Sequence, residues 1–141
     1  MNPSSGGPSN GAIRVKLTVR AGKGGGADWE HVRVNGTDYA YHYSGGSKEH
    51  GNHVAYKGGG KTTLHVELLD PHDRYELRGC TFRPEIPDEF WYTGTDATHA
   101  IVHDACNLVA STDYTILVED QDSPLKNLIP CHPMMKNIPP P

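Results

Sequence analysis

In the stretch AIRVKLTVR, residues 12–20, apolar and polar residues alternate without interruption from Ile13 onward. A period of two is the period of a β-strand, whose successive side chains point to opposite faces of a sheet. One face of this stretch is entirely aliphatic, and it consists of Ile13, Val15, Leu17 and Val19. The other face carries Arg14, Lys16, Thr18 and Arg20. The stretch therefore predicts a strand with one buried and one solvent-facing side.

Similar segments follow along the whole chain, separated by clusters of Gly, Pro, Asn and Asp. The segments that predict further strands cover residues 29–34, 38–44, 53–56, 62–70, 75–82, 90–92, 99–109 and 113–120. Gly79 interrupts the apolar pattern of its segment, which predicts a β-bulge. The segment 99–109 fits either a strand or a helix, and its β-branched Ile101 and Val102 and flanking turn residues favour a strand. No segment is a convincing amphipathic helix. Counted without one or both of the shortest segments, 53–56 and 90–92, these seven or eight strands predict an all-β fold, an immunoglobulin- or cupredoxin-like antiparallel β-sandwich.

Length and composition predict a single domain. A chain of 141 residues is large enough for one hydrophobic core, and its 16 glycines and 11 prolines suit a fold with many turns. Residues 1–11 contain almost nothing to bury, so we expect a flexible N-terminal leader followed by one β-sandwich domain over residues 12–141.

Other features of the sequence indicate where in the cell the protein is found. We expect no membrane partner, because no apolar run approaches the roughly 20 residues that a spanning helix needs. The first residues lack the basic and apolar regions of a signal peptide. The cysteines are odd in number, namely Cys80, Cys106 and Cys131. We therefore predict a soluble protein in the reducing cytoplasm.

The charge is uneven along the chain. Residues 1–69 hold eight Lys and Arg against five Asp and Glu, whereas residues 70–141 hold five against twelve. The formal net charge of −4 argues against nucleic-acid binding, despite the basic face of residues 12–20. We interpret that basic face as the protected side of an edge strand.

Several catalytic motifs are excluded on physical grounds. The segment YKGGGKTT, residues 56–63, resembles part of a phosphate-binding loop, but it opens a strand and not the helix that such a loop requires. On a strand, His99 and His103 stand about 13 Å apart and cannot share a metal ion. No serine or cysteine is marked as a nucleophile, so we predict a protein that is not an enzyme.

Three histidines form a candidate metal site. His50 and His53 lie in one predicted loop, and His42 lies on the strand before it, with Glu49 as a further potential ligand. Imidazoles brought together across a turn can bind zinc or copper. Metal binding through His42, His50 and His53 is therefore an alternative hypothesis, and we predict no other cofactor.

The segment IPCHPMMKN, residues 129–137, contains ligand types of a blue-copper site. Cys131 and His132 are neighbours, however, and their side chains diverge. We expect a closing segment that is packed by Met134 or Met135. The segment from DYTILVED to NLIPCHPMMKNIP resembles the end of an uncharacterised bacterial family known as DP-EP, because Pro133, Asn137 and Pro139 fit its closing motif. The segment YELRGCTFRPEIPDEF is similar to that family's central part. This resemblance implies a compact β-sandwich and no assigned activity.

These observations favour a non-enzymatic module that acts by binding a protein partner or by self-association. Its predicted interaction surface is aromatic and consists of Trp29, Tyr39, Tyr41, Tyr43, Trp91 and Tyr92. Metal binding through the histidines and carbohydrate binding through the aromatic residues are the alternatives.

Overall fold

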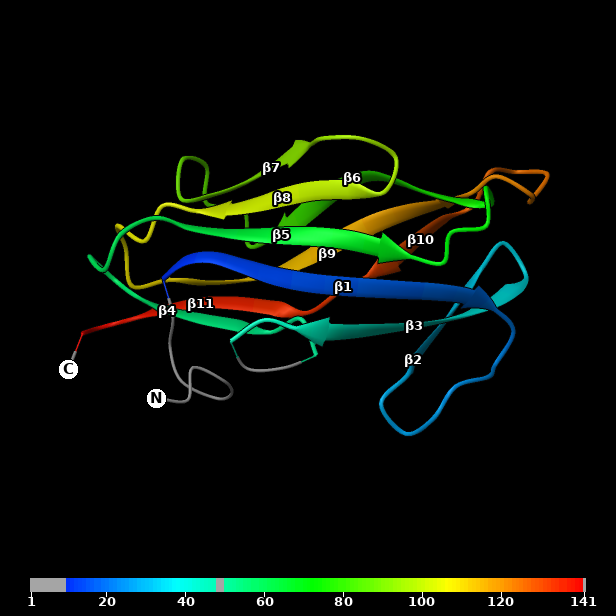
Figure 1. The fold of residues 1–141 in the computed structure, drawn as a ribbon, viewed down its shortest axis with the longest axis horizontal. Coiled ribbons are helices and arrows are strands. Elements are labelled where there is room, and N and C mark those ends of the chain that lie inside the picture. Colours follow the sequence, from blue (N-terminus) through cyan, green and yellow to red (C-terminus); the bar gives the residue numbers. More distant parts are fainter. Residues whose placement is uncertain (1–9, 48–49, 141) are drawn as a thin grey trace.

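The computed structural model describes residues 10–47 and 50–140, which form eleven strands and no helix (Figure 1). The all-β prediction is therefore confirmed. The strands are β1 (Gly11–Ala21), β2 (Glu30–Val34), β3 (Thr37–Gly45), β4 (His53–Tyr56), β5 (Thr62–Leu69), β6 (Tyr75–Arg83), β7 (Phe90–Gly94), β8 (His99–Asp104), β9 (Ser111–Asp120), β10 (Leu128–Cys131) and β11 (Met134–Ile138). None of these residues belongs to a helix that could span a membrane.

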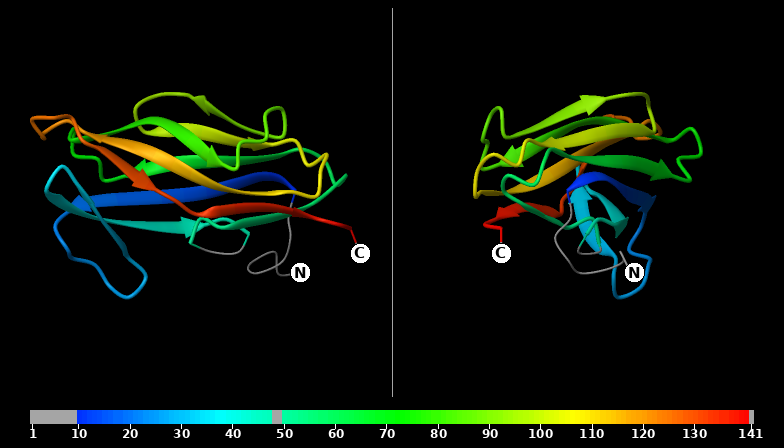
Figure 2. Two further views of the ribbon diagram at one scale, coloured as in Figure 1. Left: turned by 180° about the vertical axis from the view of Figure 1, so that it is seen from behind. Right: turned by 60° about the vertical axis from the view of Figure 1, so that its left-hand side comes forward.

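The strands form two layers, which Figure 2 shows from two sides. One sheet has six strands in the order β2-β3-β1-β5-β8-β7, and the other has the order β10-β9-β11-β4, with β6 paired to the other side of β9. The core lies between the layers and includes Leu17 of β1 and Ile116 of β9, both fully buried. The aliphatic face of β1 is thus buried as its alternation predicts, with Ile13 only partly covered.

The sheets are mixed and not purely antiparallel. β1 pairs with β3 in the antiparallel sense but with β5 in the parallel sense, because the chain crosses to the second sheet for β4 before it returns. β1 is consequently a central strand. The edge-strand interpretation of Arg14, Lys16 and Arg20 is wrong, since both edges of β1 are paired.

Two predicted boundaries differ from the structure. The segment 99–109 stays a strand only to Asp104, where the chain turns into a loop. The closing segment forms two strands, β10 and β11, which pair with different parts of β9. Other details are confirmed: the ladder between β6 and β9 shifts register between Leu77 and Gly79, and Met135 is fully buried.

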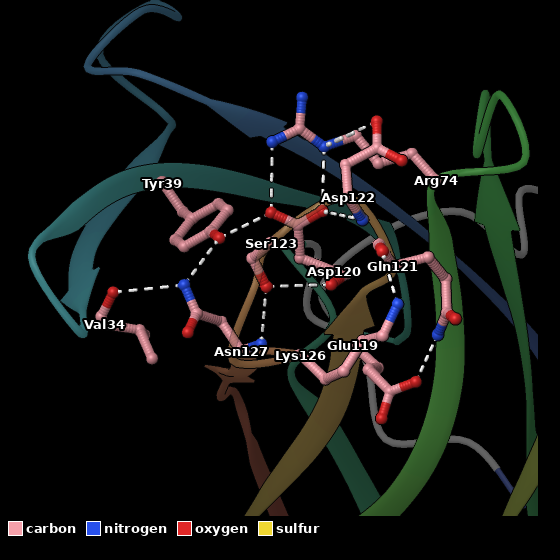
Figure 3. Close-up of polar contacts among 10 residues, drawn as sticks. All are labelled: Val34, Tyr39, Arg74, Glu119, Asp120, Gln121, Asp122, Ser123, Lys126 and Asn127. Atoms are coloured by element: carbon pink, nitrogen blue, oxygen red, sulfur yellow. Dashed lines mark hydrogen bonds and ion pairs between the residues drawn. The ribbon is translucent and has the colours of Figure 1, made fainter.

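A buried polar network joins the two sheets (Figure 3). The carboxylate of Asp120, at the end of β9, accepts hydrogen bonds from Tyr39 Oη at 2.5 Å and from Arg74 Nε and Nη2 at 2.8 and 3.0 Å. Asn127 Nδ2 donates to Tyr39 Oη at 2.9 Å and to the carbonyl of Val34 at 3.2 Å. Since Tyr39 belongs to the six-stranded sheet, this network links β3 to β9.

Candidate metal centre

Asp28, His42 and His50 form a compact group of metal-ligating side chains. One ligand atom from each residue lies within 4.8 Å of the other two. Among the residues that the structure describes, no other three metal-ligating side chains lie close enough together to hold one ion. Asp28 and His50 are exposed and His42 is half-buried, so the group lies at the surface.

The β2–β3 hairpin places His42. Its two-residue turn at Asn35 and Gly36 sets the register in which Glu30 faces Tyr41, and this register places Trp29 opposite His42. The two rings stack with centroids 5.4 Å apart. The guanidinium carbon of Arg20 lies 4.3 Å from the centroid of the Trp29 ring. His42 is thereby held against one face of an aromatic ring on the outer side of the six-stranded sheet.

The loop between β1 and β2 carries Asp28, and its own contacts fix its course. The ring nitrogen Nε2 of His31 lies 3.2 Å from the carbonyl oxygen of Lys23 and 3.1 Å from that of Gly24. Gly25 adopts a φ of 100°, and a Cβ at that position would lie 2.2 Å from Trp29 Cγ. Only glycine fits beside the indole, so the loop folds back over Trp29 and brings Asp28 towards His42.

The loop between β3 and β4 carries His50 and is tied to both sheets. Gly51 N donates to the carbonyl of Gly45 at 2.9 Å, and the Gly51 carbonyl accepts a hydrogen bond from Tyr114 Oη at 2.6 Å. A Cβ on Gly51 would lie 2.8 Å from the ring of Tyr43. These contacts position His50, whose ring centroid is 6.2 Å from that of His42.

A cleft of about 370 Å³ opens beside the group. Asp28 and His50 form part of its wall, together with Glu30 of β2 and His132 of the β10–β11 turn. A metal ion held by the three ligands would therefore border a cleft whose wall also carries a further carboxylate and imidazole. Three protein ligands beside an open position is the arrangement of metal sites that accept an additional ligand.

The sequence-based ligand set agrees with this group in two of its three histidines. His42 and His50 belong to it, whereas His53 is fully buried on β4 and is not a member. Glu49 lies outside the described residues. Asp28 is the third member and was missed, because the course of the loop between β1 and β2 cannot be predicted from its glycines.

The predicted aromatic surface is largely internal. Tyr39, Tyr41 and Tyr43 are buried in the core, because they alternate with the outward-facing residues of β3. Trp91 is half-buried and stacks on His103 at a centroid distance of 4.9 Å, with the ammonium group of Lys61 5.0 Å from the Trp91 centroid.

Trp29 and Tyr92 are also half-buried. Both tryptophans are thus occupied by neighbouring cationic or imidazole side chains, and the described residues offer no extended aromatic platform. This observation gives no support to the carbohydrate alternative.

The cysteines do not form a second site in the part of the chain that the structure describes. All three are free thiols, and Cys131 is fully buried while its neighbour His132 is exposed. Burial raises the pKa of the Cys80 thiol to about 12 and that of the Cys106 thiol to about 11. The raised pKa values favour the protonated thiol at neutral pH, whereas nucleophilic attack needs the thiolate.

No protein-family model and no curated protein sequence matches this chain. The resemblance of its second half to the DP-EP family stays a prediction.

Proposed function

We propose that this protein binds a divalent first-row transition-metal ion through Asp28, His42 and His50. The observation that supports this function is the convergence of two imidazoles and one carboxylate from two loops and a strand, with ligand atoms within 4.8 Å of one another. Imidazole ligands favour zinc, copper, nickel and iron over calcium and magnesium, which prefer oxygen ligands.

The group needs only a small adjustment to close around an ion. Bonds of about 2.0–2.1 Å in a tetrahedral site place ligand atoms roughly 3.3 Å apart. Asp28 and His50 are exposed, so their side chains are free to rotate by the required amount. The stacked ring of His42 supplies the fixed point, because Trp29 holds its orientation.

Isothermal titration of untagged protein with zinc chloride tests the proposal. We expect one ion per chain, and we expect His42→Ala, His50→Ala and Asp28→Asn each to weaken binding at least about tenfold, because each removes one of three ligands. His65→Gln is the control, since His65 is exposed on the same sheet but does not belong to the group. Equal zinc affinity in the wild type and in all three ligand variants would contradict the proposal.

Fluorescence gives an independent readout. The chain has two tryptophans, so the variant Trp91→Phe leaves Trp29 as the sole indole. Because Trp29 stacks on a proposed ligand, its emission should change on addition of zinc with the same stoichiometry as the titration.

We also propose that the protein associates with itself. Support comes from large apolar side chains that remain exposed at the two ends of β9, where a second molecule could cover them. The three free thiols support our further proposal of a reducing, cytoplasmic location.

A further inference from the structure

The exposed apolar residues lie at two separate ends of the molecule. Among the described residues, the large apolar side chains with high exposure are Leu108 (49%), Val109 (57%), Leu125 (70%) and Leu128 (45%). The first pair precedes β9 and the second pair follows it. In Figure 1 the yellow loop before β9 and the orange loop after it lie at opposite ends of the ribbon. A ten-residue strand separates them by about 33 Å.

Hydrogen bonds connect the loop that carries Leu125 to itself and to the end of β9. Ser123 Oγ donates to the Asp120 carbonyl at 2.9 Å and accepts a hydrogen bond from Asn127 N at 2.7 Å, as Figure 3 shows. Lys126 Nζ donates to the Gln121 carbonyl at 2.7 Å. The loop thus presents Leu125 and the exposed ammonium of Lys126 in one fixed arrangement, which lowers the entropic cost of docking. We call residues 125–128 the leucine tip.

An apolar groove of about 660 Å³ runs along β6 and reaches the β6–β7 loop at the opposite end. It lies between β6 and β7, each of which has one edge without a strand partner among the described residues. Its apolar lining includes Phe82, Ile86, Phe90 and Tyr92. Phe82 and Phe90 stack at a centroid distance of 6.4 Å.

The rim of this groove carries two unpaired carboxylates at its loop end. Glu85 and Asp88 line it there, both are exposed, and neither takes part in the ion pairs found in the described part of the chain. Arg78 also lines the groove, but its guanidinium is already paired with Glu76 at 3.1 Å and with Glu119 at 3.0 Å. Glu89, the residue after Asp88, accepts a hydrogen bond from the amide of Leu108 at 3.0 Å, so the loop with the exposed Leu108 and Val109 adjoins the same end.

We propose that the leucine tip of one molecule docks into the groove of a second copy, so that the molecules associate head to tail. This inference rests on the self-association proposed above and names its two surfaces. The leucines of the tip fit the aromatic lining, and Lys126 meets the unpaired carboxylates of Glu85 and Asp88. A symmetric contact between two tips would instead place Lys126 against Lys126. Because the two surfaces differ, the contact is heterologous and leads to chains or rings.

Sedimentation velocity over a concentration range tests this arrangement. We expect wild-type protein to form species larger than a dimer as its concentration rises. Leu125→Ser/Leu128→Ser removes the tip, and Glu85→Lys/Asp88→Asn reverses the rim; each variant should weaken association at least about tenfold. Ile101→Ser is the control, because it removes a half-buried apolar side chain from β8, outside both surfaces. Thermal unfolding verifies that every variant is folded.

Mixing the two variants gives the decisive measurement. The tip variant keeps an intact groove and the groove variant keeps an intact tip, so an equimolar mixture should form a one-to-one pair and nothing larger. Wild-type protein that stays monomeric at every concentration would overturn both self-association and this inference. Association that survives loss of the tip, or folded monomeric variants that do not pair on mixing, would overturn the head-to-tail contact alone.

Discussion

Asp120 is a buried carboxylate with hydrogen-bond donors on three sides. Burial by itself raises the pKa of a carboxyl group, but the hydrogen bonds from Arg74 and Tyr39 outweigh it, and the pKa of Asp120 is lowered below its usual value. Burial and the same contact with Asp120 raise the pKa of the Tyr39 hydroxyl, so Tyr39 stays a donor. One ionised residue therefore holds two sheets and the loop of the leucine tip.

This arrangement makes stability depend on pH in a defined direction. The pKa of Asp120 is lower in the folded chain than in the unfolded chain, where it is about 3.9. The stabilisation is therefore complete above that value and is lost as the pH falls through the folded pKa. We expect Asp120→Asn to lower the free energy of unfolding by about 1–3 kcal/mol at pH 7 and to flatten the acid limb of the stability profile.

Urea unfolding at pH 7 and at pH 3 measures both effects. Asp122→Asn is the matched control, because the exposed carboxylate of Asp122 lies 3.8 Å from the same guanidinium and should change stability by less than about 0.5 kcal/mol. An Asp120→Asn variant with the acid sensitivity of the wild type would show that another carboxylate is responsible.

Sequence reasoning at this scale found His42 on a strand and His50 in a loop, but it missed Asp28 and wrongly included His53. His42 could be predicted because alternation puts it on the outer face of β3. The burial of His53 and the approach of Asp28 depend on how two glycine-containing loops fold back, and the glycines alone do not specify the direction of a loop.

β11 is the strand whose position is least expected from sequence. It lies between β9 and β4, where Asn137 donates hydrogen bonds to the buried carboxylates of Glu89 at 2.8 Å and Asp104 at 2.7 Å. Its Met135 is fully buried in the core. A short strand can thus be anchored by one thioether and one amide.

We therefore expect Met135→Ala to destabilise the fold by about 2–5 kcal/mol, because it leaves a cavity between the sheets. Lys136→Ala changes the next residue, which is exposed, and should cost less than about 0.5 kcal/mol. Urea unfolding of the two variants provides the comparison. Similar losses from both changes would mean that β11 is held by its ladder and not by its packing.

A strand could be predicted from the sequence where its apolar and polar residues alternate, and it could not be predicted where they do not. β1, β5 and β9 could be predicted because each buries one face, so its sequence alternates. β10 and β11 could not, because their proline-rich segment has no periodicity, and because one partner of β11, β4, is distant in sequence. The parallel pairing of β1 with β5 was missed for a related reason: strand direction depends on the path of the connection, which alternation does not record.

At the scale of the whole molecule, bound metal should stabilise the fold. The proposed ligands come from two loops and a strand, so an unfolded chain does not bring them together, and ions that bind only the folded state raise its stability by mass action. Zinc at a hundred times its dissociation constant should add about 2.7 kcal/mol, which corresponds to roughly 5–11 °C in the unfolding temperature of a chain of this size.

Differential scanning calorimetry with and without zinc measures the shift. Asp28→Asn should abolish most of it, whereas His65→Gln should keep it. A shift of equal size in both variants would locate the stabilising ion elsewhere.

The pairing of β4 also has a consequence for synthesis of the chain. Within the described residues, β4 has β11 as its sheet neighbour, and roughly 80 residues separate the two strands. At about 5–20 residues per second, a ribosome needs on the order of 4–16 s to produce that interval. Throughout that time β4 of the nascent chain lacks its sheet partner. The second sheet is completed only after Ile138 has been synthesised. Chaperones would bind the exposed β4 during this interval.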